Sequence, residues 1–237
     1  MFEFLVNIFD VFLYRPIFNF LVLVYDYFPL QDFGLSIIIV TVVIRAILYL
    51  PSVKALRSQV AMQKLQPQIS EIQKKYKNDK EKQAQETLEL YKKEKINPFS
   101  GLFLILIQLP ILIALYRVFG YGLDPKELLN LYSFIPNPEH INPMFFKLVD
   151  LSNPNIIFAV LAGLTQFFQT KMLLPKINKD QKKNNDVSSM VQKQMVYLFP
   201  FITIAILFKL PSALGLYWTV SGIFSIAQQY IIMKKVK

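Results

Sequence analysis

The chain has no cysteine, one histidine and seven glycines among its 237 residues. Without cysteine it can form no disulfide and no cysteine-based metal site, and it has no thiol nucleophile. The single histidine, His140, lies in the proline-rich stretch IPNPEHINP, outside the apolar segments where a membrane protease needs serine with histidine or paired acids. The glycines form no phosphate-binding loop. We therefore expect no enzyme activity, no nucleotide or other cofactor and no metal.

Apolar residues, by contrast, are abundant and occur in long runs. They make up 54% of the chain and include 21 phenylalanines, a composition typical of a membrane protein. A bilayer core of ~30 Å needs roughly 20 helical residues to cross it. Five segments qualify, although the fourth is short and contains Pro200. We predict an all-α membrane protein with five transmembrane helices at residues 33–50, 99–119, 156–174, 195–210 and 214–233.

Positive charge is concentrated in alternate connections between these segments. Residues 51–98 carry eleven Lys or Arg, residues 175–194 carry five, and the tail at 234–237 is also basic. Residues 1–32 and 120–155 are poor in basic side chains. Because basic loops stay in the cytoplasm, we predict an extracytoplasmic N-terminus and a cytoplasmic C-terminus in the bacterial plasma membrane. This topology and anionic lipid headgroups account for the net charge of +10, so we expect no specific nucleic-acid recognition.

Two interpretations fit the first 32 residues, which lack the basic start and cleavage site of a signal peptide. Between Pro16 and Leu30 the apolar residues follow a helical spacing. This predicts an extracytoplasmic, interfacial amphipathic helix within residues 1–32. The alternative is a sixth span through residues 2–25, which would bury Asp10 and Arg15.

Residues 51–98 have the pattern of two soluble helices rather than of a loop. Apolar residues recur every three to five positions up to Tyr76. A turn follows at Asn78 and Asp79, and the apolar spacing then resumes. This predicts a cytoplasmic antiparallel helical hairpin, with a kink or an interruption at Pro67. The hairpin is either a solvated connector or an element that contacts a partner or covers a membrane site. Its length favours the second interpretation, because most helix connections are much shorter.

Arg45 is the residue that fits lipid least. Insertion scales assign about 2.5–3.5 kcal/mol to a central arginine, and the five predicted spans contain no Asp or Glu to pair with it. The alternative for Arg45 is that it anchors the helix by extending its charged end to the membrane surface near Pro51. The alternative for the uncharged polar residues of the spans is ordinary hydrogen bonding between helices. We predict instead a polar cavity open toward the cytoplasm. Its predicted residues are Arg45, Thr41, Gln108, Gln166, Gln169, Tyr217, Trp218, Ser221, Ser225 and Gln228.

Four strings in the chain resemble the YidC family of membrane protein insertases. They are FGLSIIIVTVVIR (33–45), LQPQISEIQKKYKNDKEKQAQETLELYKKEKINP (65–98), IQLPILIALY (107–116) and LPSALGLYWTVSGIFSIAQQ (210–229). The resemblance runs in order over roughly residues 16–233. Many members of the family carry N-terminal additions or an extended basic tail that this sequence lacks, so we expect a minimal five-span form.

The resemblance implies a five-helix core with a hydrophilic, positively charged groove open to the cytoplasm and to lipid. The family's groove arginine falls on Arg45, the preceding threonine on Thr41, the aromatic pair of the last helix on Tyr217 and Trp218, and the glutamine of the third helix on Gln169. The implied function is to receive nascent transmembrane segments and to release them laterally without nucleotide hydrolysis.

The resemblance also implies partners. These are nascent membrane proteins and anionic lipids, with the ribosome and the Sec translocon as candidates through the cytoplasmic loops. From the residues alone, a small-solute or ion transporter that uses the same polar cavity is the alternative. Transporters often contain inverted repeats, and we detect none in this sequence.

Overall fold

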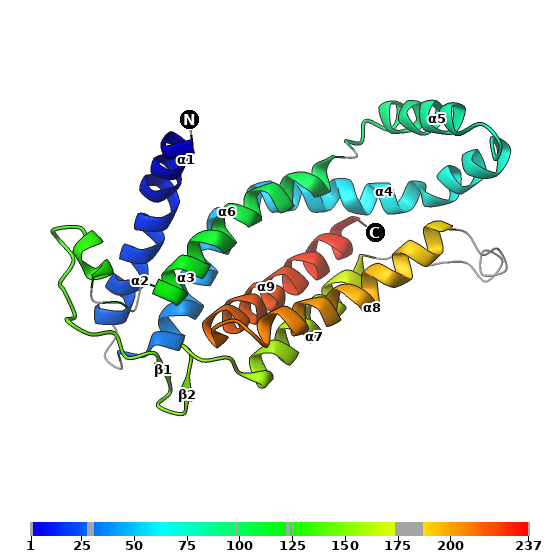
Figure 1. Cartoon of the computed structure of the whole chain (residues 1–237). Helices are drawn as coiled ribbons and strands as arrows, with labels where there is room; N and C mark the ends of the chain where they lie inside the picture. Colours follow the sequence, from blue (N-terminus) through cyan, green and yellow to red (C-terminus); the bar gives the residue numbers. More distant parts are fainter. Residues whose placement is uncertain are drawn as a thin grey trace.

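The computed structural model describes residues 2–27, 31–97, 99–121, 124, 126–173 and 187–236 (Figure 1). These residues are mostly helical, as the sequence predicts, and they also contain a pair of two-residue antiparallel strands within the predicted loop 120–155. Strands this short produce no alternating pattern that a sequence could reveal. The elements are α1 (Phe2–Phe9), the π-helix η1 (Asp10–Tyr14), α2 (Arg15–Tyr27), α3 (Phe33–Ile47), α4 (Tyr49–Lys75), α5 (Lys80–Lys93), α6 (Ser100–Tyr121), η2 (Glu127–Asn130), β1 (Met144–Phe145), β2 (Val149–Asp150), α7 (Ile156–Met172), α8 (Val187–Leu207) and α9 (Ser212–Val236).

The N-terminal helix is longer than the sequence predicts. Helical structure begins at Phe2 rather than at Pro16 and continues through η1 into α2. By length and composition, Val6–Tyr27 could cross a membrane, which fits the alternative of a sixth span. Figure 1 shows α2 meeting the bundle at the end where α3 begins and α6 ends, with α1 continuing away from that end along one side. The interfacial helix stays the prediction.

Polar contacts hold this N-terminal helix against α6 and the loop that follows it. Arg117 on α6 forms an ion pair with Asp10, and its guanidinium lies 4.3 Å from the ring centroid of Tyr14. The Tyr14 hydroxyl donates a hydrogen bond of 2.6 Å to Glu127. Asp10 therefore has a charged partner within the protein. Arg117 lies within the predicted span 99–119, where nothing in the sequence indicates its acidic partner.

The other predicted span boundaries shift by a few residues. Helix α3 ends at Ile47, and α4 leaves it at a bend of 65° that begins at Tyr49, so the hairpin starts before residue 51. Pro51 sits in the first turn of α4, where a missing N–H is tolerated. Helix α4 continues through Pro67, and the predicted interruption is absent. Helix α8 likewise contains Pro200 and starts well before residue 195, while most of the predicted loop 175–194 lies outside the described residues.

Hydropathy and length single out few of these helices as spans. Among the described residues, only Val6–Tyr27 passes as a single helix, and the bent pair α3 and α4 passes when it is taken together. Residues 106–120, 156–172 and 196–207 are apolar but shorter. Helix α9 is 25 residues long, and the polar residues along it lower its mean hydropathy. The five-span count therefore stays a prediction.

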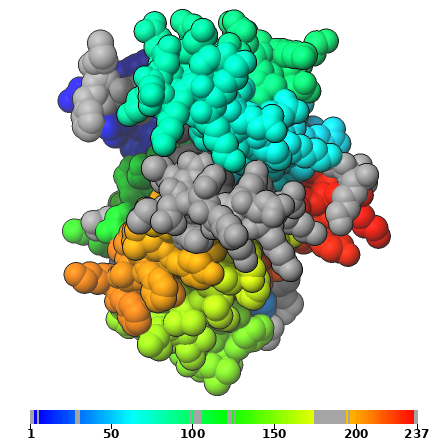
Figure 2. All heavy atoms as spheres, turned by 90° about the vertical axis from the view of Figure 1, so that its right-hand side faces the viewer, coloured from blue at the N-terminus to red at the C-terminus, as the bar shows by residue number. Residues whose placement is uncertain are grey.

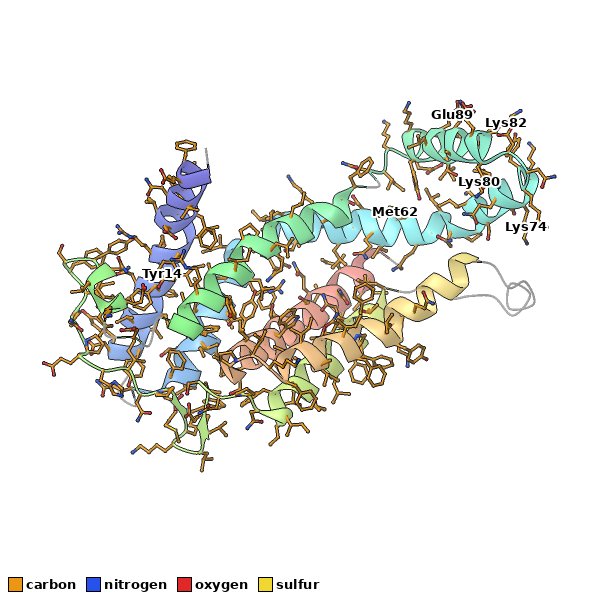
Figure 3. The ribbon with its side chains drawn as sticks, in the orientation of Figure 1. Tyr14, Met62, Lys74, Lys80, Lys82 and Glu89 are labelled. Carbon is orange, nitrogen blue, oxygen red and sulfur yellow. The ribbon has the colours of Figure 1, made fainter. Side chains whose placement is uncertain are left out.

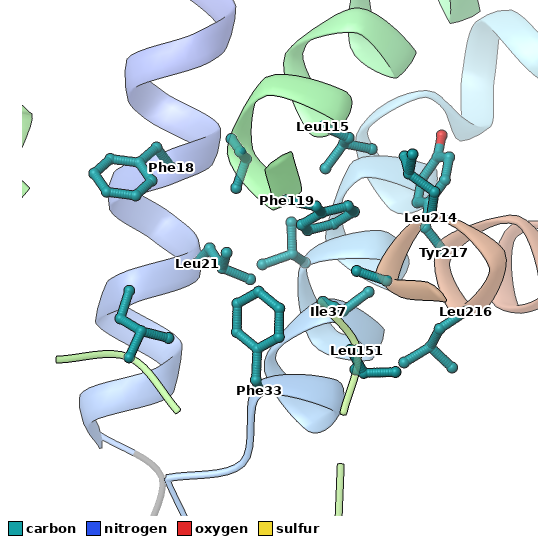
Figure 4. Close-up of a cluster of buried hydrophobic side chains, with 14 of the residues drawn as sticks. Phe18, Leu21, Phe33, Ile37, Leu115, Phe119, Leu151, Leu214, Leu216 and Tyr217 are labelled. Atoms are coloured by element: carbon teal, nitrogen blue, oxygen red, sulfur yellow. The ribbon is translucent and has the colours of Figure 1, made fainter. Parts of the chain in front are cut away.

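An apolar core fills one end of the bundle. It forms where the beginnings of α3, α7 and α9 meet the end of α6, with α2 packed across them (Figure 4). Its large, most buried members come from α2, α3, α6 and α9 and from the loop after β2. They are Phe18, Leu21, Phe33, Ile37, Leu115, Phe119, Leu151, Leu214 and Tyr217. Among the described side chains, this core does not continue to the opposite end of the same helices.

Close packing of α7 against α9 depends on glycine. A Cβ atom at Gly222 would lie 2.5 Å from Oγ1 of Thr165 on α7, and that hydroxyl is already held by a 2.9 Å hydrogen bond to the carbonyl of Ala162. Small residues commonly let membrane helices approach this closely. A Cβ at residue 222 fits only if Thr165 moves. A substitution there therefore tests how rigidly α7 and α9 are packed.

We expect Gly222→Ala to lower the thermal unfolding temperature of the purified chain in detergent. Overpacking of a close contact costs about 1–3 kcal/mol. Gly120→Ala on α6 is the matched control, because a Cβ there would meet nothing within 4 Å, and alanine favours a helix by up to about 1 kcal/mol over glycine. Equal unfolding temperatures for the two variants would show that the α7–α9 contact adapts freely.

Candidate functional site

A cavity of about 730 Å³ lies at the end of the bundle opposite the apolar core. Its walls come from the end of α3, the first half of α4, the first half of α6, the last turns of α7 and the middle of α9. Met62 on α4 is one of the lining residues, whereas Lys74, Lys80 and Lys82 lie farther out on the hairpin (Figure 3). Figure 2 looks onto this end of the molecule, with the hairpin above and α7 and α8 below. The cavity thus involves the hairpin as well as the membrane helices.

Arg45 lines this cavity without an acidic partner. Its Nε donates a hydrogen bond of 2.6 Å to the Ser221 hydroxyl on α9, and one terminal nitrogen also donates to that oxygen. No lining residue is acidic, and Arg45 forms no ion pair in the described part of the chain. Arg117, the other arginine in a predicted span, is ion-paired. Arg45 therefore presents a positive charge that no carboxylate among the described residues neutralises.

Nine of the ten predicted cavity residues line this one cavity, and Thr41 does not. Thr41 lies one turn before Arg45, but its side chain is buried, and its hydroxyl donates a 2.6 Å hydrogen bond to the carbonyl of Ile37 in its own helix. This bond to the preceding turn is a common alternative for threonine within helices. Thr41 is therefore not among the residues that line this cavity, and its role toward a client stays a prediction.

Some of the other predicted residues also join helices to one another. Gln108 on α6 donates to the hydroxyl of Tyr217 on α9. The side-chain oxygen of Gln166 on α7 accepts a hydrogen bond of 2.6 Å from Thr203 on α8. Both glutamines thus form the hydrogen bonds between helices that polar residues commonly form in membranes, and both also line the cavity. No hydrogen bond of the Gln169 side chain is found among the described residues.

The wall formed by α4 is the part of the site that sequence reasoning missed. Gln59, Gln63 and Gln66 line the cavity, and their spacing of four and three residues places them on one face of α4. Tyr91, on α5, also lines the cavity, and burial raises the pKa of its phenol, which keeps it neutral. The spacing of the three glutamines was visible in the sequence. What could not be seen was that this face turns toward the membrane helices.

The arrangement defines a class of protein: a helical membrane protein with a cavity rich in polar side chains and a long helical hairpin as one wall. Arg45 in this cavity has no acidic partner among the described residues. The model of the 60Kd inner membrane protein family matches residues 23–237, and the chain belongs to this family. Membership places it in the bacterial inner membrane.

Curated relatives carry the name membrane protein insertase YidC. The chain is 37% identical over 204 residues to the protein of Fusobacterium nucleatum, covering 86% of this chain and 87% of that one. It is 35% identical over 207 residues to the protein of Clostridium tetani, covering 87% and 84%. It is 34% identical over 242 residues to the protein of Beijerinckia indica, covering 94% of this chain but 37% of that longer protein.

Proposed function

We propose that the chain is a membrane protein insertase that receives a nascent transmembrane segment at its cavity and releases it laterally into the bilayer without nucleotide hydrolysis. The observation that carries this proposal is the cavity itself, with Arg45 exposed to it and no acidic residue in its lining. The names of the relatives support the same activity.

The physical problem for such a protein is the polar tail of its client. Lipid accommodates the apolar helix, but an unpaired polar group that leaves water costs several kcal/mol. A polar cavity that reaches part of the way into the membrane shortens the apolar distance that the tail must cross. The client helix then leaves sideways along α3 and α9, driven by the burial of its own apolar surface in lipid.

Arg45 supplies the charge that draws the tail into the cavity. An acidic tail, or the carbonyl oxygens of an uncharged one, would be attracted to the guanidinium. With the N-terminus outside and the C-terminus in the cytoplasm, the membrane potential then pulls a negative tail outward by ~2.3 kcal/mol per charge per 100 mV. The basic cytoplasmic loops are the proposed contacts for anionic lipid, the ribosome and the Sec translocon.

Reconstitution tests the proposal most directly. The purified full chain is placed in lipid vesicles and offered a single-span client with a short acidic tail. We expect the tail to become protected from external protease only when the chain is present. The same vesicles are tested for ion and solute flux. Flux without client insertion would establish the transporter alternative instead.

A further inference from the structure

Glutamine dominates the polar lining of the cavity. Eight lining residues are glutamines, whereas Arg45 is the only charged one. They come from four helices: α4, α6, α7 and α9. The eight are Gln59, Gln63, Gln66, Gln108, Gln166, Gln169, Gln228 and Gln229. A side-chain amide both donates and accepts hydrogen bonds and carries no charge, so a surface of amides can pair with groups of either polarity.

Two of these glutamines already bind main-chain carbonyls. The Gln63 amide nitrogen donates to the carbonyl of Leu173, the residue that caps the end of α7. Carbonyls at the end of a helix lack partners within it. The Gln228 amide nitrogen donates a hydrogen bond of 3.3 Å to the carbonyl of Tyr49, at the start of α4. These contacts show the geometry that the lining amides offer to peptide groups.

Gln229 has an amide oxygen without a hydrogen-bond partner among the described residues. The residue is only 3% exposed, and the oxygen itself is covered. A buried acceptor without a partner is costly, and this one belongs to a residue of the cavity wall. A main-chain N–H group from another polypeptide would satisfy it after the side chain rotates toward the cavity.

We propose that the stripe Gln59, Gln63 and Gln66 on α4, together with Gln228 and Gln229 on α9, is a binding site for the main chain of a non-helical polypeptide segment, whatever the charge of that segment. A helix satisfies its own N–H and C=O groups, so it offers little to an amide surface. An extended segment presents both groups along its length and can pair with several amides. The proposal rests on the proposed function, because the segment is the polar tail of the client.

This site and Arg45 then have different tasks. The amide stripe lies on the hairpin helix and recognises the conformation of the tail, whereas Arg45, on α3, responds to its charge. A tail that is neutral and rich in glycine, serine and asparagine would still be held at the stripe.

The test compares clients that differ only in the tail. One tail is neutral and rich in Gly, Ser and Asn, a second has the same length but is Ala-rich and helical, and a third is non-helical and acidic. In vesicles, we expect Gln59→Leu/Gln66→Leu to reduce insertion of both non-helical tails by about fivefold, since one interhelical hydrogen bond in a membrane is worth well under tenfold. Insertion of the helical tail should fall much less.

Three comparisons make the result decisive. Gln68→Leu/Gln85→Leu removes two exposed glutamines of the same hairpin that do not line the cavity, and it should insert all three tails normally. Gln59→Asn/Gln66→Asn keeps the amides and should restore most of the loss, which excludes misfolding as the cause. A loss that follows tail charge, or no loss for any tail while the unaltered chain inserts them, would overturn the inference. Failure of the unaltered chain to insert any client would overturn the proposed function instead.

Discussion

Arg45→Ala should reduce the insertion of a client with an acidic tail by about tenfold or more. Two unit charges 4 Å apart interact by about 4 kcal/mol at an effective dielectric constant of 20, and a third of that energy corresponds to tenfold. No lining residue provides a second positive charge, so nothing in the cavity wall replaces the lost guanidinium. The measurement is cleavage of the tail by external protease in spheroplasts of cells depleted of their own insertase, where only an inserted tail is accessible. A client with a neutral tail is the control and should lose much less.

Two further substitutions separate attraction from hydration. Arg45→Lys keeps the charge but loses the pair of donors that bind the Ser221 hydroxyl, so we expect much of the activity to remain. Arg45→Gln keeps a polar, hydrated side chain without the charge. If Arg45→Gln inserted acidic tails as well as the unaltered chain does, Arg45 would serve to keep the cavity wet. If Arg45→Ala left every client unaffected, the attraction would be wrong altogether.

Much of the helical structure could be predicted because lipid leaves few choices. An apolar segment in a bilayer must satisfy its own main-chain groups, and a helix does so within one segment. The apolar runs therefore located α3, α6, α7, α8 and α9, and most of the predicted ends lie within a few residues of the observed ones. The start of α8, well before residue 195, is the exception. The N-terminal helix was underestimated because Asp10 interrupts its apolar spacing. Its partner, Arg117, is more than a hundred positions away in the sequence, and only the folded chain brings the two together.

Turns and bends were harder to predict than helices. The 65° bend between α3 and α4 lies before Pro51, the residue at which the hairpin was predicted to start. Of the kink or interruption expected at Pro67, the interruption is absent, because the helix runs on to Lys75. A proline removes one hydrogen bond from a helix, and packing along the rest of the helix can compensate. Whether it does so depends on neighbours that the local sequence does not reveal.

The site was predictable where the energetic cost was large. A charged residue without a counter-ion in an apolar run has few explanations, and Arg45 does line a polar cavity. Thr41 lies on the same helical face as Arg45, but a threonine hydroxyl can bond a carbonyl of its own helix. The cost of burying Thr41 is therefore small, and its place in the sequence said little about whether it lines the cavity. The glutamines of α4 were missed for a similar reason. Their polarity suits a solvated hairpin equally well, and their role depends on the direction in which α4 leaves α3.

Removing residues 65–91 should reduce insertion of acidic-tailed clients by about tenfold or more, while the membrane helices still assemble. The deletion takes away Gln66 and Tyr91, which line the cavity. Each polar group of the tail that loses its partner costs several kcal/mol, and tenfold corresponds to only about 1.4 kcal/mol. Insertion is measured in vesicles with the segment replaced by a short Gly-Ser linker.

A shorter deletion decides what the hairpin contributes. Removing residues 74–86 with the same linker takes away the tip and most of the lysines that surround the turn, but leaves every lining residue of the cavity in place. Helix α5 has no buried residue, so this variant should fold and retain most of its insertion activity in pure vesicles. Equal losses from both deletions would place the function at the tip, in contact with a partner or the lipid surface. Full activity in both variants would return the hairpin to the role of a solvated connector. Because α4 supplies one wall of the cavity, we expect only the longer deletion to disable it.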